Sequence, residues 1–304
     1  MKKNDKYEKT LELITGAKTM PLDEALETLI LCAKKSYPLA SVRSVQEIAL
    51  INSPMVVPCL AELYDWFEEK PHDRDRACDI RIIIVECLGE IGSVRSIDTL
   101  KKAIRTVQIA KLGPSPEDVA IGLRATAAIS LANVDSDCLY ELAILLHDEE
   151  PAIPVSPVSR PFVKAATRSA AAKAIGAVGG AGGAAILATK LKYPKDEVPE
   201  VLAECLESLI WMKPPYLMEV VTPYLMGKNE YLCAITALAL AENFGAEVLD
   251  LLCEALEKVD NESKEGIVIA ISVIKGSSIR QLLQDFLEHP NSYVRKGAKK
   301  VLDV

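Results

Sequence analysis

The fold is decided by the stretch Asp79-Ile-Arg-Ile-Ile-Ile-Val-Glu-Cys-Leu-Gly-Glu-Ile-Gly92. Its apolar residues recur at steps of three and four, which is the spacing of one buried face of an α-helix. Gly92 follows the last apolar residue, and glycine commonly ends helices because it adopts the left-handed conformation without strain. The stretch therefore predicts an amphipathic helix with a wide apolar face and a sharp stop.

The same phrase recurs along the chain. Each copy has an arginine followed seven residues later by Leu or Ile, at Arg43, Arg81, Arg124, Arg168 and Arg295. Three degenerate copies place Leu202, Ala234 and Lys264 at the arginine position. Successive copies lie 38, 43, 44, 34, 32, 30 and 31 residues apart. Periods of this length indicate a solenoid, in which each repeat packs only on its neighbours.

A second amphipathic helix is expected before most copies, for example over 56–68, 97–109, 139–146, 217–226, 248–256 and 279–287. Pro or Gly separates these segments, and no alternating two-residue pattern predicts a strand. An additional N-terminal helix is expected over 4–16. The sequence therefore predicts an all-α, right-handed α-α superhelix (a HEAT/armadillo-type solenoid) of about eight helical hairpins over residues 1–304.

Three stretches resemble the HEAT repeat, especially the short repeats of phycobilin-lyase-like proteins. They are Leu88-Gly-Glu-Ile-Gly-Ser-Val-Arg-Ser-Ile-Asp-Thr-Leu100, Ala174-Ile-Gly-Ala-Val-Gly-Gly-Ala-Gly-Gly-Ala-Ala-Ile-Leu187 and His289-Pro-Asn-Ser-Tyr-Val-Arg-Lys-Gly-Ala-Lys-Lys-Val-Leu302. The resemblance covers almost the whole chain and is specific for fold, whereas HEAT arrays serve many functions. It implies that the second helix of each hairpin lines a concave surface.

Charge divides the predicted solenoid into two dissimilar parts. Residues 1–194 hold 25 acidic and 24 basic side chains, in longer repeats interrupted by a Pro-rich insertion over 148–161. Shorter joints at 70–76 and 111–118 are insertions of the same kind. Residues 195–304 form regular short repeats, of which 195–290 hold 17 acidic and 7 basic side chains. These acidic residues are either solvated outer faces or a surface for a basic segment of a partner.

Four arginines form the main candidate site. Because the resemblance places second helices on the concave face, a ladder of partner-binding cations is expected at Arg43, Arg81, Arg124 and Arg168. In this interpretation their guanidinium groups pair with carboxylates or phosphates of a partner. In the alternative interpretation each arginine is structural and bonds an acidic residue or an open carbonyl of the neighbouring hairpin. Trp66 and Trp211 are additional candidate anchors for a partner.

Catalytic and metal chemistry find no support in the sequence. The eight cysteines contain no Cys-x-x-Cys pair and stand among Leu, Ile and Ala, which predicts buried, reduced thiols and a cytoplasmic location. No catalytic residue, metal ligand or cofactor is predicted. Apolar runs such as 80–88 and 233–241 are about half the length of a membrane span, and no membrane partner is expected.

The sequence therefore favours a non-catalytic protein-binding scaffold or adaptor that uses its concave face and whose partner is a protein of unidentified sequence. Two alternatives stay open. The resemblance to phycobilin-lyase-like proteins implies a tetrapyrrole chaperone or lyase subunit. Some HEAT-like proteins are DNA glycosylases that hold duplex DNA, although an acidic surface opposes binding to a phosphate backbone.

Overall fold

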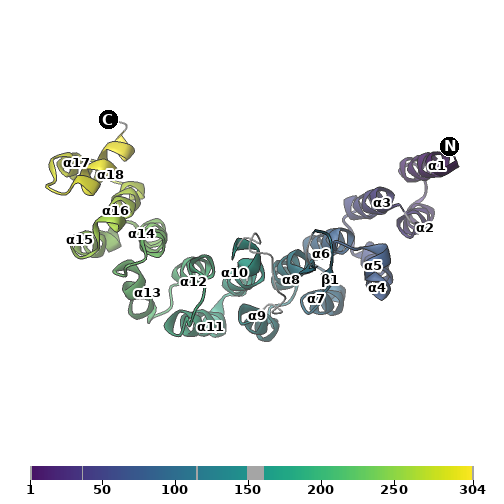
Figure 1. Cartoon of the computed structure of the whole chain (residues 1–304), viewed down its shortest axis with the longest axis horizontal. Helices are drawn as coiled ribbons and strands as arrows, with labels where there is room; N and C mark the ends of the chain where they lie inside the picture. Colours follow the sequence, from purple (N-terminus) through teal and green to yellow (C-terminus); the bar gives the residue numbers. More distant parts are fainter. Residues whose placement is uncertain (1, 36, 114–115, 149–160, 303–304) are drawn as a thin grey trace. The chain divides into compact units, whose positions relative to one another are not determined.

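The protein is described by a computed structural model that covers residues 2–35, 37–113, 116–148 and 161–302. The chain separates into two compact units, Met1–Ala174 and Ile175–Val304. In the described ranges the helices follow one another as eight pairs after the additional helix α1 (Lys2–Ala17), each with a first and a second helix. Figure 1 shows these pairs in each unit. The predicted all-α solenoid of HEAT-like hairpins is confirmed.

The first unit contains three complete pairs and most of a fourth. They are α2 (Leu22–Ala33) with α3 (Pro38–Leu50), α4 (Val57–Glu69) with α6 (Asp79–Ile91), α7 (Ile97–Ala103) with α8 (Ile121–Val134), and α9 (Leu139–Leu146) with α10 (Pro161–Val178). The short helices η1 (Pro54–Val56) and η2 (Val94–Ser96) lead into α4 and α7. Second helices pack on second helices, α3 on α6 and α6 on α8.

The core of the first unit consists of the apolar stripes read from the sequence. Ile84 and Leu88 of α6 are fully buried, as are Leu123 and Leu131 of α8. Each such side chain contributes roughly 1.5–3 kcal/mol when it leaves water. Gly92 ends α6 with φ of +67°, as its position after the apolar run predicts. The repeating apolar face is therefore the surface on which neighbouring hairpins stack.

The inserted joints depart from the expected pattern. The joint at 70–76 contains the short helix α5 (Pro71–Arg74). The expected helix over 97–109 ends at Ala103, and a small antiparallel ladder follows it, β1 (Ile109–Ala110) with β2 (Glu117–Asp118). Two-residue strands are too short to show an alternating pattern, so the sequence analysis did not predict this pair of strands. The predicted Pro-rich insertion over 148–161 lies outside the described residues, except for its two ends.

The second unit contains four complete pairs. They are α11 (Gly180–Lys192) with α12 (Pro199–Met212), α13 (Leu217–Leu225) with α14 (Glu230–Phe244), α15 (Leu249–Lys258) with α16 (Asn261–Val273), and α17 (Ser277–Asp285) with α18 (Ser292–Leu302). Two short helices, η3 (Gly245–Val248) and η4 (Phe286–Glu288), complete it. The second helices α12, α14, α16 and α18 pack on one another in this order and form one layer. Figure 1 shows the first helices α11, α13 and α15 together on one side of that layer.

Small residues bring the second helices close together. A Cβ placed on Gly266 of α16 would lie 2.7 Å from the Cβ of Ala234 on α14. A Cβ on Gly297 of α18 would lie 2.9 Å from Val268 of α16. Both distances are shorter than real Cβ contacts, so these positions require glycine. Two of the glycines that the sequence places inside helices therefore set the spacing of the layer of second helices.

The stretch Glu230–Lys258 has the length and apolar composition of a membrane-spanning helix. It is longer than the runs considered from the sequence. In the structure it is not one continuous α-helix, because it turns into η3 at Gly245, whose φ is +60°. Its first part, α14, packs between α12 and α16, and core helices of this kind meet the same criterion. Packing within the unit therefore accounts for these apolar residues.

Candidate functional site

Arg81 is buried inside the first unit. Its side chain is 1% exposed, and its Nε lies 3.0 Å from Oδ2 of Asp75 in the preceding joint. The same carboxylate accepts the backbone N–H groups of Ile80 and Arg81 at 3.1 Å, at the start of α6. Nη2 of Arg81 donates to Oε1 of Gln108 and contacts Sγ of Cys78 at 3.2 Å. Arg81 therefore ties its own helix to two joints of the unit.

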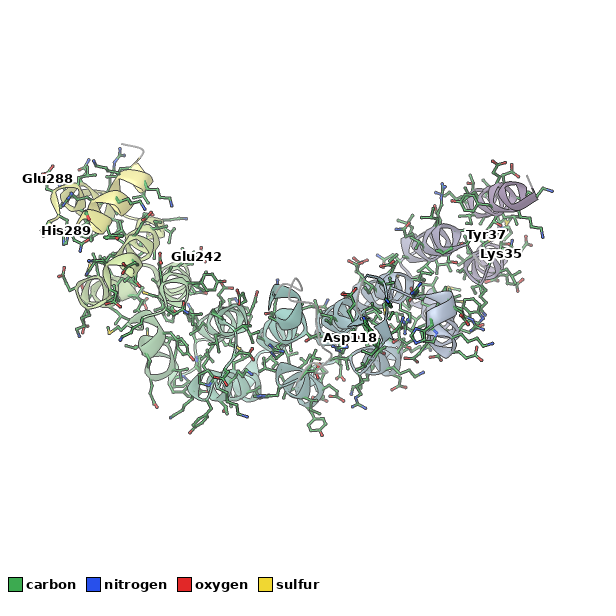
Figure 2. All side chains as sticks on the ribbon, viewed as in Figure 1. Lys35, Tyr37, Asp118, Glu242, Glu288 and His289 are labelled. Carbon is green, nitrogen blue, oxygen red and sulfur yellow. The ribbon has the colours of Figure 1, made fainter. Side chains whose placement is uncertain are left out.

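Arg124 has an equivalent position in the next hairpin. Its side chain is 2% exposed, and Nη1 donates to Oδ2 of Asp118 at 2.7 Å and to the carbonyl of Thr106 at 2.9 Å. The other oxygen of Asp118, which is labelled in Figure 2, accepts the N–H groups of Gln108 and Ala120 at 3.2 and 3.0 Å. This pair therefore closes the joint that holds β1 and β2.

Other copies of the basic residue reach the carbonyl end of the first helix in their own hairpin. Arg168 donates to the carbonyl of Asp148 after α9, and Arg295 donates to that of His289 after η4. Lys264 donates to the carbonyl of Leu256 in the last turn of α15. The last carbonyls of a helix lack intrahelical partners and carry partial negative charge, so a cation stabilises them. In these three hairpins the repeated basic residue therefore caps the first helix.

These contacts correct the predicted ladder of partner-binding arginines. For Arg81 and Arg124 the prediction is wrong, because both guanidinium groups are buried and bonded within the chain. The structural alternative describes them better, because each arginine pairs with an acidic residue of its own joint and also reaches a joint of the next hairpin, at Gln108 for Arg81 and at Asp148 for Arg124. Arg168 is half-buried with a bond to its own joint, and Arg43 alone of the four is exposed. Partner binding at these two residues stays a prediction.

Trp66 is covered by its own chain. The guanidinium carbon of Arg74 lies 4.0 Å from the centre of the indole ring, and Phe67 packs against it edge-on. Since one face already stacks on a cation, a partner has less of this side chain to contact. Trp211 differs, because 62% of its side chain is exposed at the end of α12. Of the two predicted anchors, Trp211 is therefore the one that the structure presents to solvent.

Trp211 belongs to a stripe of exposed residues that sequence reasoning missed. Glu200, Glu204, Glu207 and Trp211 stand at positions i, i+4, i+7 and i+11 of α12, which is the spacing of one helix face. Glu200 and Glu204 are half-exposed and form no ion pair with any residue that the structure describes. The spacing was visible in the sequence, where only the net acidity of the region was used. We call these four residues the α12 stripe.

Tyr231 extends the α12 stripe onto the next second helix. It stands in the first turn of α14 beside the exposed Glu230, and 47% of its side chain is exposed. Partial burial raises the pKa of its hydroxyl, and so do three carboxylates of the α12 stripe. The geometric basis is that α14, whose first turn carries Tyr231, packs directly on α12. An aromatic ring flanked by carboxylates is the arrangement that attracts a lysine or arginine side chain.

A cleft lies at the other end of the α12 stripe. It has a volume of about 720 Å³ and lies between the turn that joins α10 to α11 and the turn that joins α12 to α13. Ala177 to Ala181, Ala184 and Ala185 line one side, and Trp211 to Tyr216 line the other. Small side chains on one side and large apolar ones on the other leave room for an apolar group.

The described residues contain no group of three or more His, Cys, Asp or Glu side chains that could hold a metal ion. All eight cysteines are free thiols. Burial raises the pKa of Cys78 and of Cys205 to about 12, so both stay protonated near neutral pH. Nucleophilic attack requires the thiolate, which burial of this kind disfavours.

Comparison with known proteins supports the repeat fold. Residues 80–106 match the family model of the PBS lyase HEAT-like repeat. The solved structure of Kap121p bound to Pho4p is similar over 94% of this chain and 34% of Kap121p, with 14% identity and a TM-score of 0.53. The structure of Kap121p bound to Nup53p gives the same coverage and identity with a TM-score of 0.54. No curated protein sequence matches the chain.

The chain has the fold of a HEAT-repeat solenoid, as the matched repeat, the helix pairs and the likeness to Kap121p show. It spans about a third of the length of Kap121p, and at this identity the likeness concerns the fold. Human deoxyhypusine hydroxylase in complex with glycerol matches over 97% of this chain and 95% of its own, at 16% identity. Its TM-score of 0.26 is too low to support a common arrangement.

Proposed function

We propose that this HEAT-repeat protein is a non-catalytic scaffold that binds a protein partner on the exposed face of its second helices. The α12 stripe with Tyr231 is the observation that carries the proposal. Two aromatic side chains, those of Trp211 and Tyr231, stand exposed on the same pair of helices as Glu200 and Glu204, which have no cation among the described residues. Exposed aromatic residues are the usual anchors of protein interfaces. Kap121p, which has a similar fold, is bound to Pho4p in one solved structure and to Nup53p in the other.

The charges of the α12 stripe favour a functional surface over an arbitrary solvated face. Like charges at i and i+4 on a helix destabilise it by roughly 0.2–0.5 kcal/mol. Glu265 of α16, by contrast, lies 2.6 Å from Lys296 and 3.6 Å from Lys300 of the next second helix. Glu200, Glu204 and Glu230 lack such a cation within the described ranges. A basic partner would supply it.

The two alternatives have less support. Duplex DNA requires accessible cations, whereas Arg81 and Arg124 are buried and the α12 stripe is acidic. The match to the PBS lyase HEAT-like repeat covers a single repeat and so bears on fold rather than on a tetrapyrrole. A cytoplasmic location is part of the proposal, because eight free cysteines suit a reducing compartment.

A site-specific photo-crosslinking amino acid tests the proposal in the native host. It is placed at Glu204 on the second-helix face, and at the exposed Asp250 of the first helix α15 as the matched control. Mass spectrometry then identifies the crosslinked proteins. We expect a reproducible protein adduct from position 204 and none from position 250. Equal adducts from both positions, or no adduct from position 204, would overturn the proposal.

A further inference from the structure

We propose that the α12 stripe and the cleft beside Trp211 recognise one extended segment of a protein partner, which carries a basic residue about three positions away from a bulky apolar one. This inference rests on the proposed scaffold function and deepens it. The basic side chain lies between Tyr231 and the carboxylates of α12. The apolar side chain enters the cleft.

The cleft provides the apolar half of the site. Its volume of about 720 Å³ falls within the range of roughly 300–1,000 Å³ in which proteins bind compact ligands. The side formed by α11 presents Ala181 and Ala185, which are exposed and small. The opposite side presents the indole of Trp211 and the ring of Tyr216, 62% and 38% exposed. An apolar side chain placed between these sides removes both aromatic rings from water.

The wall of the cleft that carries Trp211 is already rigid. Lys213, the residue after α12, has a left-handed backbone with φ of +51°. Its Nζ donates to the carbonyl of Asn243 at 2.6 Å and lies 4.5 Å from the centre of the Phe244 ring. Lys213 therefore binds the C-terminal end of α14 and holds the turn after α12 in place. A wall that is fixed before binding lowers the entropic cost of association.

Charge selects the other half of the ligand. Glu200 and Glu204 stand on the same face of α12 as Trp211, and the exposed Tyr231 stands in the first turn of α14, which packs on α12. A lysine or arginine there gains ion pairs and a cation–π contact. An acidic partner would meet like charges and be rejected. The occupant is therefore a basic and apolar segment.

Helix geometry sets the spacing. Seven residues separate Glu204 from Trp211, and at 1.5 Å per residue they are about 10 Å apart along α12. An extended chain covers about 3.3–3.6 Å per residue, so about three residues span this distance. A helical segment would need about seven residues, and a short free segment would first have to nucleate a helix at a cost in free energy. The geometry therefore favours the extended form.

Fluorescence anisotropy with short labelled peptides tests the inference on the full chain. The test peptide contains Arg-Ser-Gly-Leu in a Gly/Ser background. In three comparison peptides, Leu stands next to Arg, Glu replaces Arg, or Ser replaces Leu. We expect the first peptide to bind about tenfold more tightly than each of the others. Added salt should weaken it, because charge pairing contributes. Equal binding of all four peptides, or no binding of the first, overturns the inference.

Three variants of the protein place the site. Trp211→Ala removes the anchor, Ala185→Phe fills the cleft from an exposed helix position, and Glu204→Lys reverses one charge. We expect each to weaken the test peptide about tenfold. Tyr140→Ala and Asp250→Lys are matched exposed controls and should bind as the unaltered chain does. Circular dichroism verifies folding, and Ala185→Phe keeps the test valid if Trp211→Ala is unstable.

The inference and the proposed function fail in different ways. If the partner crosslinked from position 204 still binds Trp211→Ala and Ala185→Phe fully, the scaffold function stands and the inference is wrong. If position 204 yields no adduct, the proposed function itself is wrong. Light scattering tests whether a second copy of the chain occupies the cleft instead. Self-association that disappears in Trp211→Ala would place a second copy of the chain there and overturn the inference.

Discussion

The Nε atom of Arg81 lies 3.0 Å from Oδ2 of Asp75, and neither side chain is more than 2% exposed. Asp75 stands in the joint before α6, and Arg81 is in the first turn of that helix. The pair therefore links an irregular joint to the regular layer of second helices. Asp118 and Arg124 repeat the arrangement one hairpin later, at 2.7 Å. Two buried pairs thus hold the longer joints of the first unit in place.

Removal of the Asp75 carboxylate should destabilise the first unit strongly. In Asp75→Ala the guanidinium of Arg81 stays buried without its counter-ion, and two N–H groups at the start of α6 lose their acceptor. Loss of one member of a buried ion pair costs about 3–5 kcal/mol. Urea unfolding followed by circular dichroism measures this loss.

Arg43→Ala is the matched control, because Arg43 has the same repeat position but is exposed. Its effect should stay within about 0.5 kcal/mol. If both variants lose the same stability, the structural role assigned to the Arg81 pair is wrong.

Asp118→Ala should open the joint between α7 and α8. Both oxygens of this carboxylate are engaged, one by two backbone N–H groups and the other by Arg124. We expect limited proteolysis to cleave within 104–120 at least about tenfold faster, since each 1.4 kcal/mol raises the open population tenfold. Glu117→Ala, an exposed neighbour in the same strand, should be cleaved at the rate of the unaltered chain. Equal rates for the two variants would contradict the assignment.

Tyr224 should make the stability of the second unit depend on alkaline pH. Its hydroxyl donates to the carbonyl of Leu191 at 2.6 Å, and burial raises its pKa to about 12. In the unfolded chain a tyrosine titrates near 10. The folded state thus holds the proton more tightly, so this contribution is complete below pH 10 and is lost as the pH rises from 10 to 12.

Tyr224→Phe isolates this effect. Below pH 10 the variant should be less stable by about 1 kcal/mol, the usual value of one hydrogen bond. As the pH rises beyond 10, the unaltered chain should lose stability relative to the variant, and the difference should shrink. Urea midpoints at a series of pH values provide the measurement. A difference that does not change with pH would show that the hydroxyl does not titrate as described.

The repeat was predictable because each hairpin uses the same local rules. The apolar steps of Ile80 to Ile91, followed by Gly92, specify a helix and its end without knowledge of any neighbour. The β1–β2 ladder was not predictable in this way. Its two-residue strands have no pattern of their own, and the carboxylate of Asp118 holds the start and end of the joint together.

The candidate site was less predictable than the fold, because exposure depends on packing. Arg43 and Arg81 occupy the same position of the repeat, yet one is exposed and the other is buried. A local signal for burial existed in the sequence, since Asp75 and Asp118 each stand six residues before their arginine. The i, i+4, i+7, i+11 spacing that ends at Trp211 was also visible. Proximity of Tyr231 to that stripe required the structure, because it depends on how α12 packs on α14.

Gly266 and Ala234 provide a test of the packing between second helices. Gly266→Ala places a Cβ 2.7 Å from that of Ala234, so one helix must move, and overpacking of this kind costs about 1–3 kcal/mol. Ala234→Gly removes the opposing Cβ, and the next neighbour, the Cα of residue 234, then lies 3.3 Å away. The double variant exchanges glycine and alanine between two helices, so the intrinsic helix propensities nearly cancel.

We therefore expect each single variant to be less stable than the unaltered chain and the double variant to approach it. Thermal unfolding of the four proteins gives the coupling energy between the two sites. Additive losses in the double variant would mean that α14 and α16 are not in the close contact described.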